Sequence, residues 1–301
     1  KVIMKRLVLV FVSLVLMSLP VGADDFQDGI NAANQEDHGT AFVKFFEAYK
    51  SVAAIMPKTY LVYSKEEKIS YVRGQLDGEV NLMESMNHPD SDQLIDCANK
   101  KNTEIISQSL RLKNNLELNL PMAWNTQKLF GRFCGETNRK NKNLPYAHRT
   151  THLDLINLIW DARGINKNDR SVYAGSVMRE CMENKGWVFS SDGKKTLESD
   201  GKNELDEDTE LCLEMDEKDF HEKHDQIHNA YFHGVIDGFI FILYNYYGIP
   251  NTMGYLRCVS DPEKLKKSIR AFKNFNNKGL HRDGGPVNTA MVAQSMVCGD
   301  L

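Results

Sequence analysis

The sequence lacks the local motifs that identify many enzyme active sites. It contains no Gly-x-Ser-x-Gly elbow, no Walker phosphate-binding loop and no dinucleotide-binding fingerprint. It also lacks a Cys-x-x-Cys pair, which argues against a thioredoxin-type redox centre and against a thiolate zinc site. Because no feature points to catalysis or to a required cofactor, we predict a protein that is not an enzyme.

The sequence also has no excess of positive charge, and it has no long apolar run beyond its first residues. The chain has 37 Lys and Arg against 41 Asp and Glu, a net charge of −4. Nucleic acids and anionic membranes select basic surfaces, so this balance argues against both as partners. The apolar run 239–249 is too short to cross a membrane, and we expect it in the core. The partner that we expect is another protein.

The first 23 residues have the pattern of a secretory signal peptide. Lys5 and Arg6 precede an apolar stretch over 7–19, and small residues occupy the −3 and −1 positions before a cleavage point near Ala23-Asp24. Cleavage there would leave 34 basic and 41 acidic residues, a net charge of −7. We therefore expect a periplasmic or secreted protein.

One short pattern occurs twice. Residues 71–78 and 231–238 share Tyr, Gly, Asp and Gly at a shift of 160, as Tyr-x-x-Gly-x-x-Asp-Gly. In both copies a cysteine follows, and then a segment that begins with proline and ends in Cys-Gly. The common order of these features indicates an internal duplication.

The duplication also suggests a disulfide pattern. All six cysteines follow the predicted cleavage point, and an even number in an oxidising compartment indicates disulfides. Six cysteines allow fifteen pairings, and equivalence of the two copies selects among them. The predicted pairs are Cys97–Cys134, Cys258–Cys298 and the remaining pair Cys181–Cys212.

Apolar residues at helical spacing predict a mainly α protein. We expect two repeated, disulfide-closed small helical bundles, together with an N-terminal helical hairpin and a helical insert. A polar, acidic, glycine-punctuated stretch at 190–210 predicts a mobile loop. The predicted segments are a signal peptide at 1–23, a helical hairpin at 24–58, a first repeat at 59–137, a middle segment at 138–218 and a second repeat at 219–301.

The repeated glycines and aspartates each have two interpretations. Gly74 and Gly78, like Gly234 and Gly238, lie one helical turn apart, which allows close approach of a neighbouring helix or of a ligand. We favour helix packing. The aspartates at 77 and 237 lie among apolar neighbours, where a buried carboxylate needs a partner. They are either general acids or bases, or carboxylates that cap a nearby helix or turn, and we favour the second role.

A group of histidines is the strongest candidate for chemistry. His221, His224 and His228 lie on one face of a predicted helix, and imidazole is a ligand for Zn²⁺, Cu²⁺ and Ni²⁺. The alternatives are a divalent metal site, a pH-sensing group and an ordinary solvated helix face. His148 and His152 form a second pair at i and i+4. The first copy has no equivalent histidines.

The second copy resembles the Tai-type immunity domain, which protects bacteria from peptidoglycan amidases delivered by type VI secretion. The residues that carry the resemblance are the helix with Gly234 to Gly238, the stretch Cys258-Val-Ser-Asp-Pro262, and the final helix from Pro286 to Cys298. The resemblance covers about 80 residues there and is weaker in the first copy, where no proline follows Cys97.

This resemblance implies a non-catalytic protein that inhibits an amidase by inserting a loop into its active-site cleft. The corresponding loop would contain His281, Arg282 and Asp283. Two other functions remain open from the residues alone. One is a periplasmic stress or chaperone-like factor, and the other is a metal-binding protein that uses His221, His224 and His228.

Overall fold

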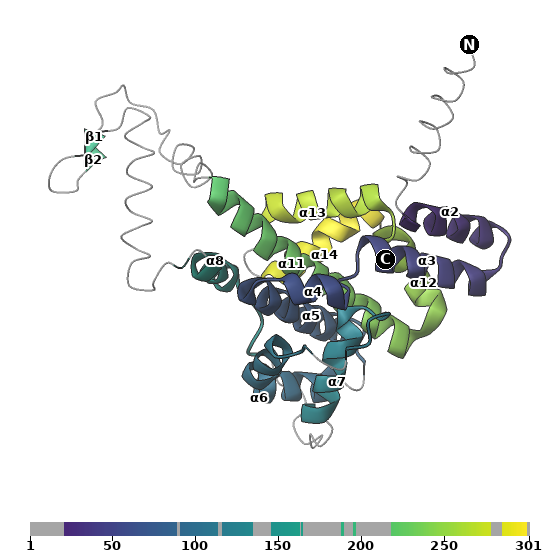
Figure 1. Cartoon of the computed structure of the whole chain (residues 1–301), viewed down its shortest axis with the longest axis horizontal. Helices are drawn as coiled ribbons and strands as arrows, with labels where there is room; N and C mark the ends of the chain where they lie inside the picture. The colour runs from purple at the N-terminus through teal and green to yellow at the C-terminus, as the bar shows by residue number, and fades with distance from the viewer. Residues whose placement is uncertain are drawn as a thin grey trace, which may run out of the picture.

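The computed structural model describes residues 21–88, 91–113, 116–134, 146–162, 164, 188–189, 195–196, 218–277 and 285–299 (Figure 1). These residues are mainly helical, as predicted. The helices are α2 Val21–Asn34, α3 His38–Val52, α4 Pro57–Val62, α5 Lys65–Ser85, α6 Ser91–Leu110, α7 Met122–Cys134, α8 His152–Ala162, α11 Lys218–Ile242, the π-helix η1 Leu243–Tyr247, α12 Gly248–Val259, α13 Pro262–Asn277 and α14 Gly285–Cys298. Two short strands, β1 Val188–Phe189 and β2 Lys195–Thr196, pair antiparallel.

Local hydrogen bonds define where several helices begin. Ser64 and Glu67 form a capping box at the start of α5, in which each side chain accepts from the other's backbone N–H. Asp261 accepts from the backbone N–H groups of Glu263 and Lys264 at the start of α13. These side chains satisfy amide groups that have no partner within the helix.

Helices α2 and α3 form the N-terminal hairpin and pack beside α12 (Figure 1). The connection turns at Glu36, whose φ is 59°. Phe45 is fully buried on α3, and its ring lies so close to Gly29 that a side chain at residue 29 would collide with it. The missing side chain at Gly29 therefore allows the two helices of the hairpin to approach.

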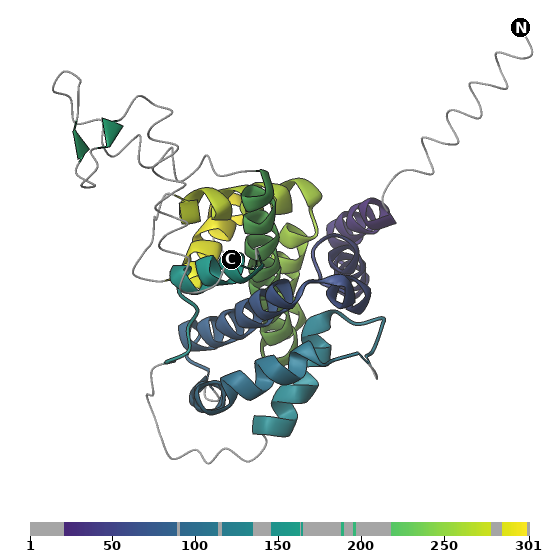
Figure 2. The same cartoon turned by 60° about the vertical axis from the view of Figure 1, so that its left-hand side comes forward.

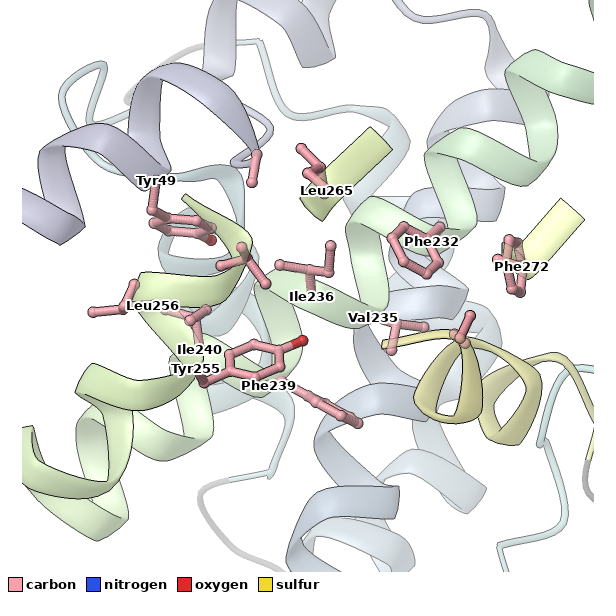
Figure 3. Close-up of a cluster of buried hydrophobic side chains, with 14 of the residues drawn as sticks. Tyr49, Phe232, Val235, Ile236, Phe239, Ile240, Tyr255, Leu256, Leu265 and Phe272 are labelled. Atoms are coloured by element: carbon pink, nitrogen blue, oxygen red, sulfur yellow. The ribbon is translucent and has the colours of Figure 1, made fainter. Parts of the chain in front are cut away.

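The largest core cluster surrounds α11. Figure 3 shows Phe232 and Ile236 of α11 close to side chains from α12 and α13, including Leu256 and Phe272. All four side chains are fully buried. A disulfide between Cys258 and Cys298 joins the end of α12 to the end of α14, with the two Cα atoms 5.7 Å apart. The predicted pairing of these two cysteines is confirmed.

The first copy has a second core cluster built by α4 to α7. Tyr60, Tyr71, Ile105 and Met122 are buried in it. Cys97 is also buried there and is disulfide-bonded. The side chain of Cys134, its predicted partner, lies outside the described residues, as do Cys181 and Cys212. These two pairings remain predictions, as does the mobile loop at 190–210, which also lies outside the described residues.

The two copies of the motif meet at the centre of the molecule. Helices α5 and α11 cross there (Figure 2) and run in the same direction. The direction follows from contacts at both ends: Ser70 Oγ donates to Ile227 O at 2.7 Å, and the His88 ring contacts the Tyr246 ring. The described parts of the two copies therefore share an interface, and the prediction of two repeated bundles is not confirmed.

Candidate functional site: the paired Tyr-Gly-Asp-Gly motifs

The glycines bring the two backbones into contact. A Cβ added to Gly74 would lie 2.1 Å from Tyr231 O, and one added to Gly234 would lie 2.1 Å from Tyr71 O. Both distances are far shorter than a van der Waals contact, and the obstacle is backbone in each case. Gly78 and Gly238 face Val235 O and Gln75 O in the same reciprocal way. This is the close helix packing that the glycine spacing predicts.

The tyrosine of each motif binds the aspartate of the other. Tyr71 Oη donates to Asp237 Oδ2 at 2.6 Å, and Tyr231 Oη donates to Asp77 Oδ2 at 2.7 Å. Such reciprocal pairing is the geometry of a two-fold interface, in which the same patch is used on both sides. Two copies of one motif within a single chain therefore pack as an internal pseudo-dimer.

Each aspartate also holds a segment that belongs to only one copy. Asp237 accepts from Tyr49 Oη on α3 at 2.5 Å and from the backbone N–H of Ile55 at 3.1 Å. Asp77 accepts from the backbone N–H of Thr150, just before α8, at 3.2 Å. The two carboxylates thereby attach the N-terminal hairpin and α8 to the central helix pair.

Burial determines what these carboxyl groups can do. Asp77 and Asp237 expose 1% and 0% of their surface. Burial raises the pKa of Asp77 to about 6, and the hydrogen bonds from Thr150 and Tyr231 oppose this rise. Burial likewise raises the pKa of Asp237 to about 7, against the donors Tyr49, Tyr71 and Ile55. A general acid or base must reach its substrate, so these buried groups fit a structural role.

The pseudo-symmetry does not extend to every side chain of the helix pair. Gln75 and Glu79 of α5 correspond to Val235 and Phe239 of α11 at the shift of 160. Gln75 Nε2 donates to Glu79 Oε1 at 2.7 Å, and Gln127 Nε2 donates to the other carboxyl oxygen. Burial raises the pKa of Glu79 to about 8. The first copy thus buries a polar network where the second copy is apolar.

The structure describes two side chains of the predicted histidine face, His224 and His228. His228 Nδ1 lies 3.0 Å from His224 O. Because a carbonyl oxygen only accepts, this nitrogen carries hydrogen and is not free to bind a metal. Burial lowers the pKa of His228 well below its usual range, and the neighbouring His224 adds to this effect. The His221 side chain lies outside the described residues.

The remaining histidine predictions divide between described and undescribed residues. His148 Nε2 lies 2.9 Å from Asn99 O, while His152 lies near the buried His228. Among the described residues, no three His, Cys, Asp or Glu side chains are arranged to hold a metal ion. The loop residues His281, Arg282 and Asp283 lie outside the described residues.

The prediction that residues 239–249 lie in the core is wrong for its second half. Ile240 and Leu243 are buried, but Tyr244 and Tyr246 expose 43% and 46% of their surface. Here α11 continues into the π-helix η1, whose wider turn changes the register of the side chains. Periodicity assumes a regular helix, so it could not show that these tyrosines reach the surface.

Tyr244 belongs to an aromatic cluster that sequence reasoning missed. Its ring centroid lies 6.1 Å from that of Phe46 on α3 and 6.0 Å from that of Trp124 on α7. Phe241 completes the group, 5.3 Å from Trp124. The cluster joins the N-terminal hairpin, the first copy and the second copy. Phe46, Trp124 and the pair Phe241 and Tyr244 lie too far apart in the sequence for a local pattern to connect these three segments.

Comparisons with protein-family models, curated proteins and solved structures return no match to this chain. The described helices include none that is both long and apolar enough to span a membrane.

Proposed function

We propose that this chain is a non-catalytic protein-binding protein that acts in the periplasm or after secretion, as an immunity protein that inhibits a peptidoglycan amidase. The observation that carries the proposal is the reciprocal pairing of Tyr71 with Asp237 and of Tyr231 with Asp77. This pairing gives Asp77 and Asp237, the residues of the duplicated motif that could act as a general acid or base, a structural role.

The paired helices suit a protein that binds by shape. The glycines of α5 and α11 bring the two backbones into contact, and each buried carboxylate accepts several hydrogen bonds. Together these contacts hold the helices in one arrangement. A rigid scaffold lowers the entropy lost on binding, because few groups must be ordered when the partner arrives. Catalysis would require a reactive group in contact with substrate, whereas Asp77 and Asp237 are enclosed.

The resemblance of the second copy to Tai-type immunity domains supplies the partner in this proposal. The segments that carry it include the buried helix Gly234 to Gly238 and the segments joined by the Cys258–Cys298 disulfide. An oxidised disulfide is consistent with a periplasmic location. Cleavage near Ala23-Asp24 would release the protein there.

An inhibition assay tests the proposal. Purified residues 24–301 are mixed at increasing molar ratios with secreted peptidoglycan amidases, and the release of peptides from purified sacculi is followed by chromatography. We expect one amidase to lose activity at about one equivalent, with a stoichiometric complex on size exclusion. The proposal is overturned if no amidase is inhibited and a pull-down from periplasmic extract recovers no stoichiometric protein partner.

A matched variant separates specific inhibition from indirect effects. Gly234→Ala would disturb the scaffold, whereas Gly254→Ala on α12 meets no atom within 4 Å. Inhibition should be lost or weakened in the first variant and unchanged in the second. Equal inhibition by both would contradict the role that we assign to the helix crossing.

A further inference from the structure

Three cations lie together on the outer side of α13. Lys266, Lys267 and Arg270 are exposed, and their spacing of three and four residues places them on one side of the helix. We define these three residues as the basic face. The opposite side of α13 carries Leu265 and Phe272, which are buried in the largest core cluster. Packing of α13 therefore directs the three cations toward solvent.

The basic face has no acidic partner among the described residues. From α12 to α14 these residues include six Lys and Arg but only two acids, a net charge of +4. Of the two acids, Asp261 caps α13, and Glu263 forms no ion pair with the basic face. A fourth cation of α13, Lys273, does have a partner, Asp225 of α11 at 2.9 Å. Lysines of α3, α6 and α7 are also paired with acids, namely Lys44, Lys100 and Lys128.

The chain itself contains a strongly acidic segment. Residues 198–217, which we call the acidic segment, carry ten Asp and Glu and one Lys, a net charge of −9. They lie outside the described residues. Because residues 24–301 have a net charge of −7, the remaining residues of that range sum to +2. The whole negative excess of the chain therefore belongs to this segment.

The acidic segment joins the described structure close to α13. It ends at Lys218, the first residue of α11, and Figure 1 shows the first turns of α11 beside α13. Asp225 lies about 10 Å further along α11 and contacts Lys273, and Lys266 lies about 10 Å from Lys273 along α13. An extended segment of 20 residues spans up to about 66 Å. The acidic segment is therefore long enough to reach the whole basic face.

We propose that the basic face of α13 binds the acidic segment of the same chain. A single exposed ion pair is weak, so the binding depends on several pairs at once and on the covalent connection. The connection gives the segment an effective concentration on the order of 1 mM at the face. A second copy of the chain at ordinary concentrations is therefore a weaker competitor. Nucleic acids and anionic membranes are disfavoured as well, because the segment's charge of −9 repels them.

This contact has a consequence for recognition. An acidic protein would bind α13 only after it displaces the acidic segment, so the segment acts as an internal competitor. The proposal goes beyond amidase inhibition and does not depend on it.

Carbodiimide cross-linking of residues 24–301 tests the contact directly. The reagent joins a lysine amine to a carboxylate that lies against it, and mass spectrometry of the digested monomer identifies the joined residues. We expect Lys266 and Lys267 to be joined to acids of 198–217 at low salt. These products should fall about tenfold in about 1 M salt, where the Debye length is about 3 Å. A mixture of isotope-labelled and unlabelled chains shows whether both residues come from one molecule.

A competition measurement provides a second readout. The probe is a fluorescent polyglutamate peptide, and its binding is followed by anisotropy at low salt. In the neutral-segment variant, the eight Asp and Glu of 204–217 are replaced by Asn and Gln. We expect this variant to bind the probe about fivefold or more tightly than the original chain does, because the tethered competitor is gone.

Matched charge variants locate the binding site for the probe. Within the neutral-segment variant, replacing Lys266, Lys267 and Arg270 with Gln should weaken probe binding about tenfold or more. The control removes the same positive charge from three other exposed lysines, Lys58, Lys65 and Lys113, and should leave probe binding unchanged.

Three outcomes would overturn the proposal. The first is that Lys266 and Lys267 form no salt-sensitive cross-links to the acidic segment. The second is equal probe binding by the original chain and the neutral-segment variant, which would show that the face is open to an external acidic protein. The third is cross-links only between labelled and unlabelled chains, which would assign the face to a second copy. Because no amidase is present, these outcomes are distinguishable from failure of the inhibition assay.

Discussion

Replacing Gly234 with alanine should destabilise the protein, although helix propensity alone predicts that the change stabilises it. In an exposed helix interior this change is favourable by about 1 kcal/mol. At residue 234, however, the new Cβ would lie 2.1 Å from Tyr71 O and 2.9 Å from Gln75 N. Both atoms belong to the α5 backbone and cannot rotate away. The two helices must therefore separate by about 1.3 Å to restore an ordinary contact of 3.4 Å.

The cost of this separation has two sources. Overpacking of a well-packed interior costs about 1–3 kcal/mol. The bonds from Tyr71 to Asp237 and from Tyr231 to Asp77 cross the same interface, and a hydrogen bond to a charged group contributes about 1.5–3 kcal/mol. Allowing for the gain in helix propensity and for partial relaxation, we expect Gly234→Ala to lower the free energy of unfolding by about 2–3 kcal/mol.

Urea unfolding followed by circular dichroism measures this difference, with Gly254→Ala as the control. Gly254 lies in α12 with nothing within 4 Å of its added Cβ. The control should therefore be as stable as the original protein or up to about 1 kcal/mol more stable. If Gly234→Ala proves as stable as Gly254→Ala, then α5 and α11 do not cross with their backbones in contact.

Two further predictions concern pH and the disulfide. The folded pKa of His228 lies below its unfolded value of 6.5, so the stability associated with the neutral ring is complete above pH 6.5 and is lost as the pH falls. Between pH 7.5 and 5.5, the free energy of unfolding of the original protein should fall relative to that of His228→Asn by an amount on the order of 1 kcal/mol. The comparison cancels Asp77 and Asp237, whose raised pKa values act in the opposite direction. Parallel pH curves for the two proteins would contradict this. Replacing Cys258 and Cys298 together with serine should cost about 4 kcal/mol in the chain-entropy model for a separation of 40 residues, measured by thermal or urea unfolding, and an unchanged midpoint would show that the bridge adds no stability.

Much of the fold could be predicted because its signals are local. Phe42, Phe45 and Tyr49 have the spacing of one helix face and lie in α3, and Asp261 before Pro262 is a common helix-start pattern and precedes α13. Helix caps and apolar periodicity depend on residues within one or two turns. The equivalence of two motifs in one chain also led to the confirmed pairing of Cys258 with Cys298.

The candidate site was only partly predictable. The sequence indicated that Asp77 and Asp237 were buried and needed partners, but the favoured role of capping a nearby helix or turn covers only part of what they do. Tyr231 and Tyr71, which donate to them, lie 154 and 166 residues away. The sequence signal was the repeated tyrosine itself, which stands at the same place in both motifs.

The sequence by itself determined the mainly helical character and the duplicated Tyr-Gly-Asp-Gly motif. Composition, caps and internal repetition are properties of residues close together in the chain or of one copy compared with another. Only the tertiary structure decided that the two motifs bind each other, and that Phe46, Trp124 and Tyr244 meet at the surface. Those contacts depend on how α5 crosses α11 and on the π-helical turn at η1. Both are set by packing between segments far apart in the sequence.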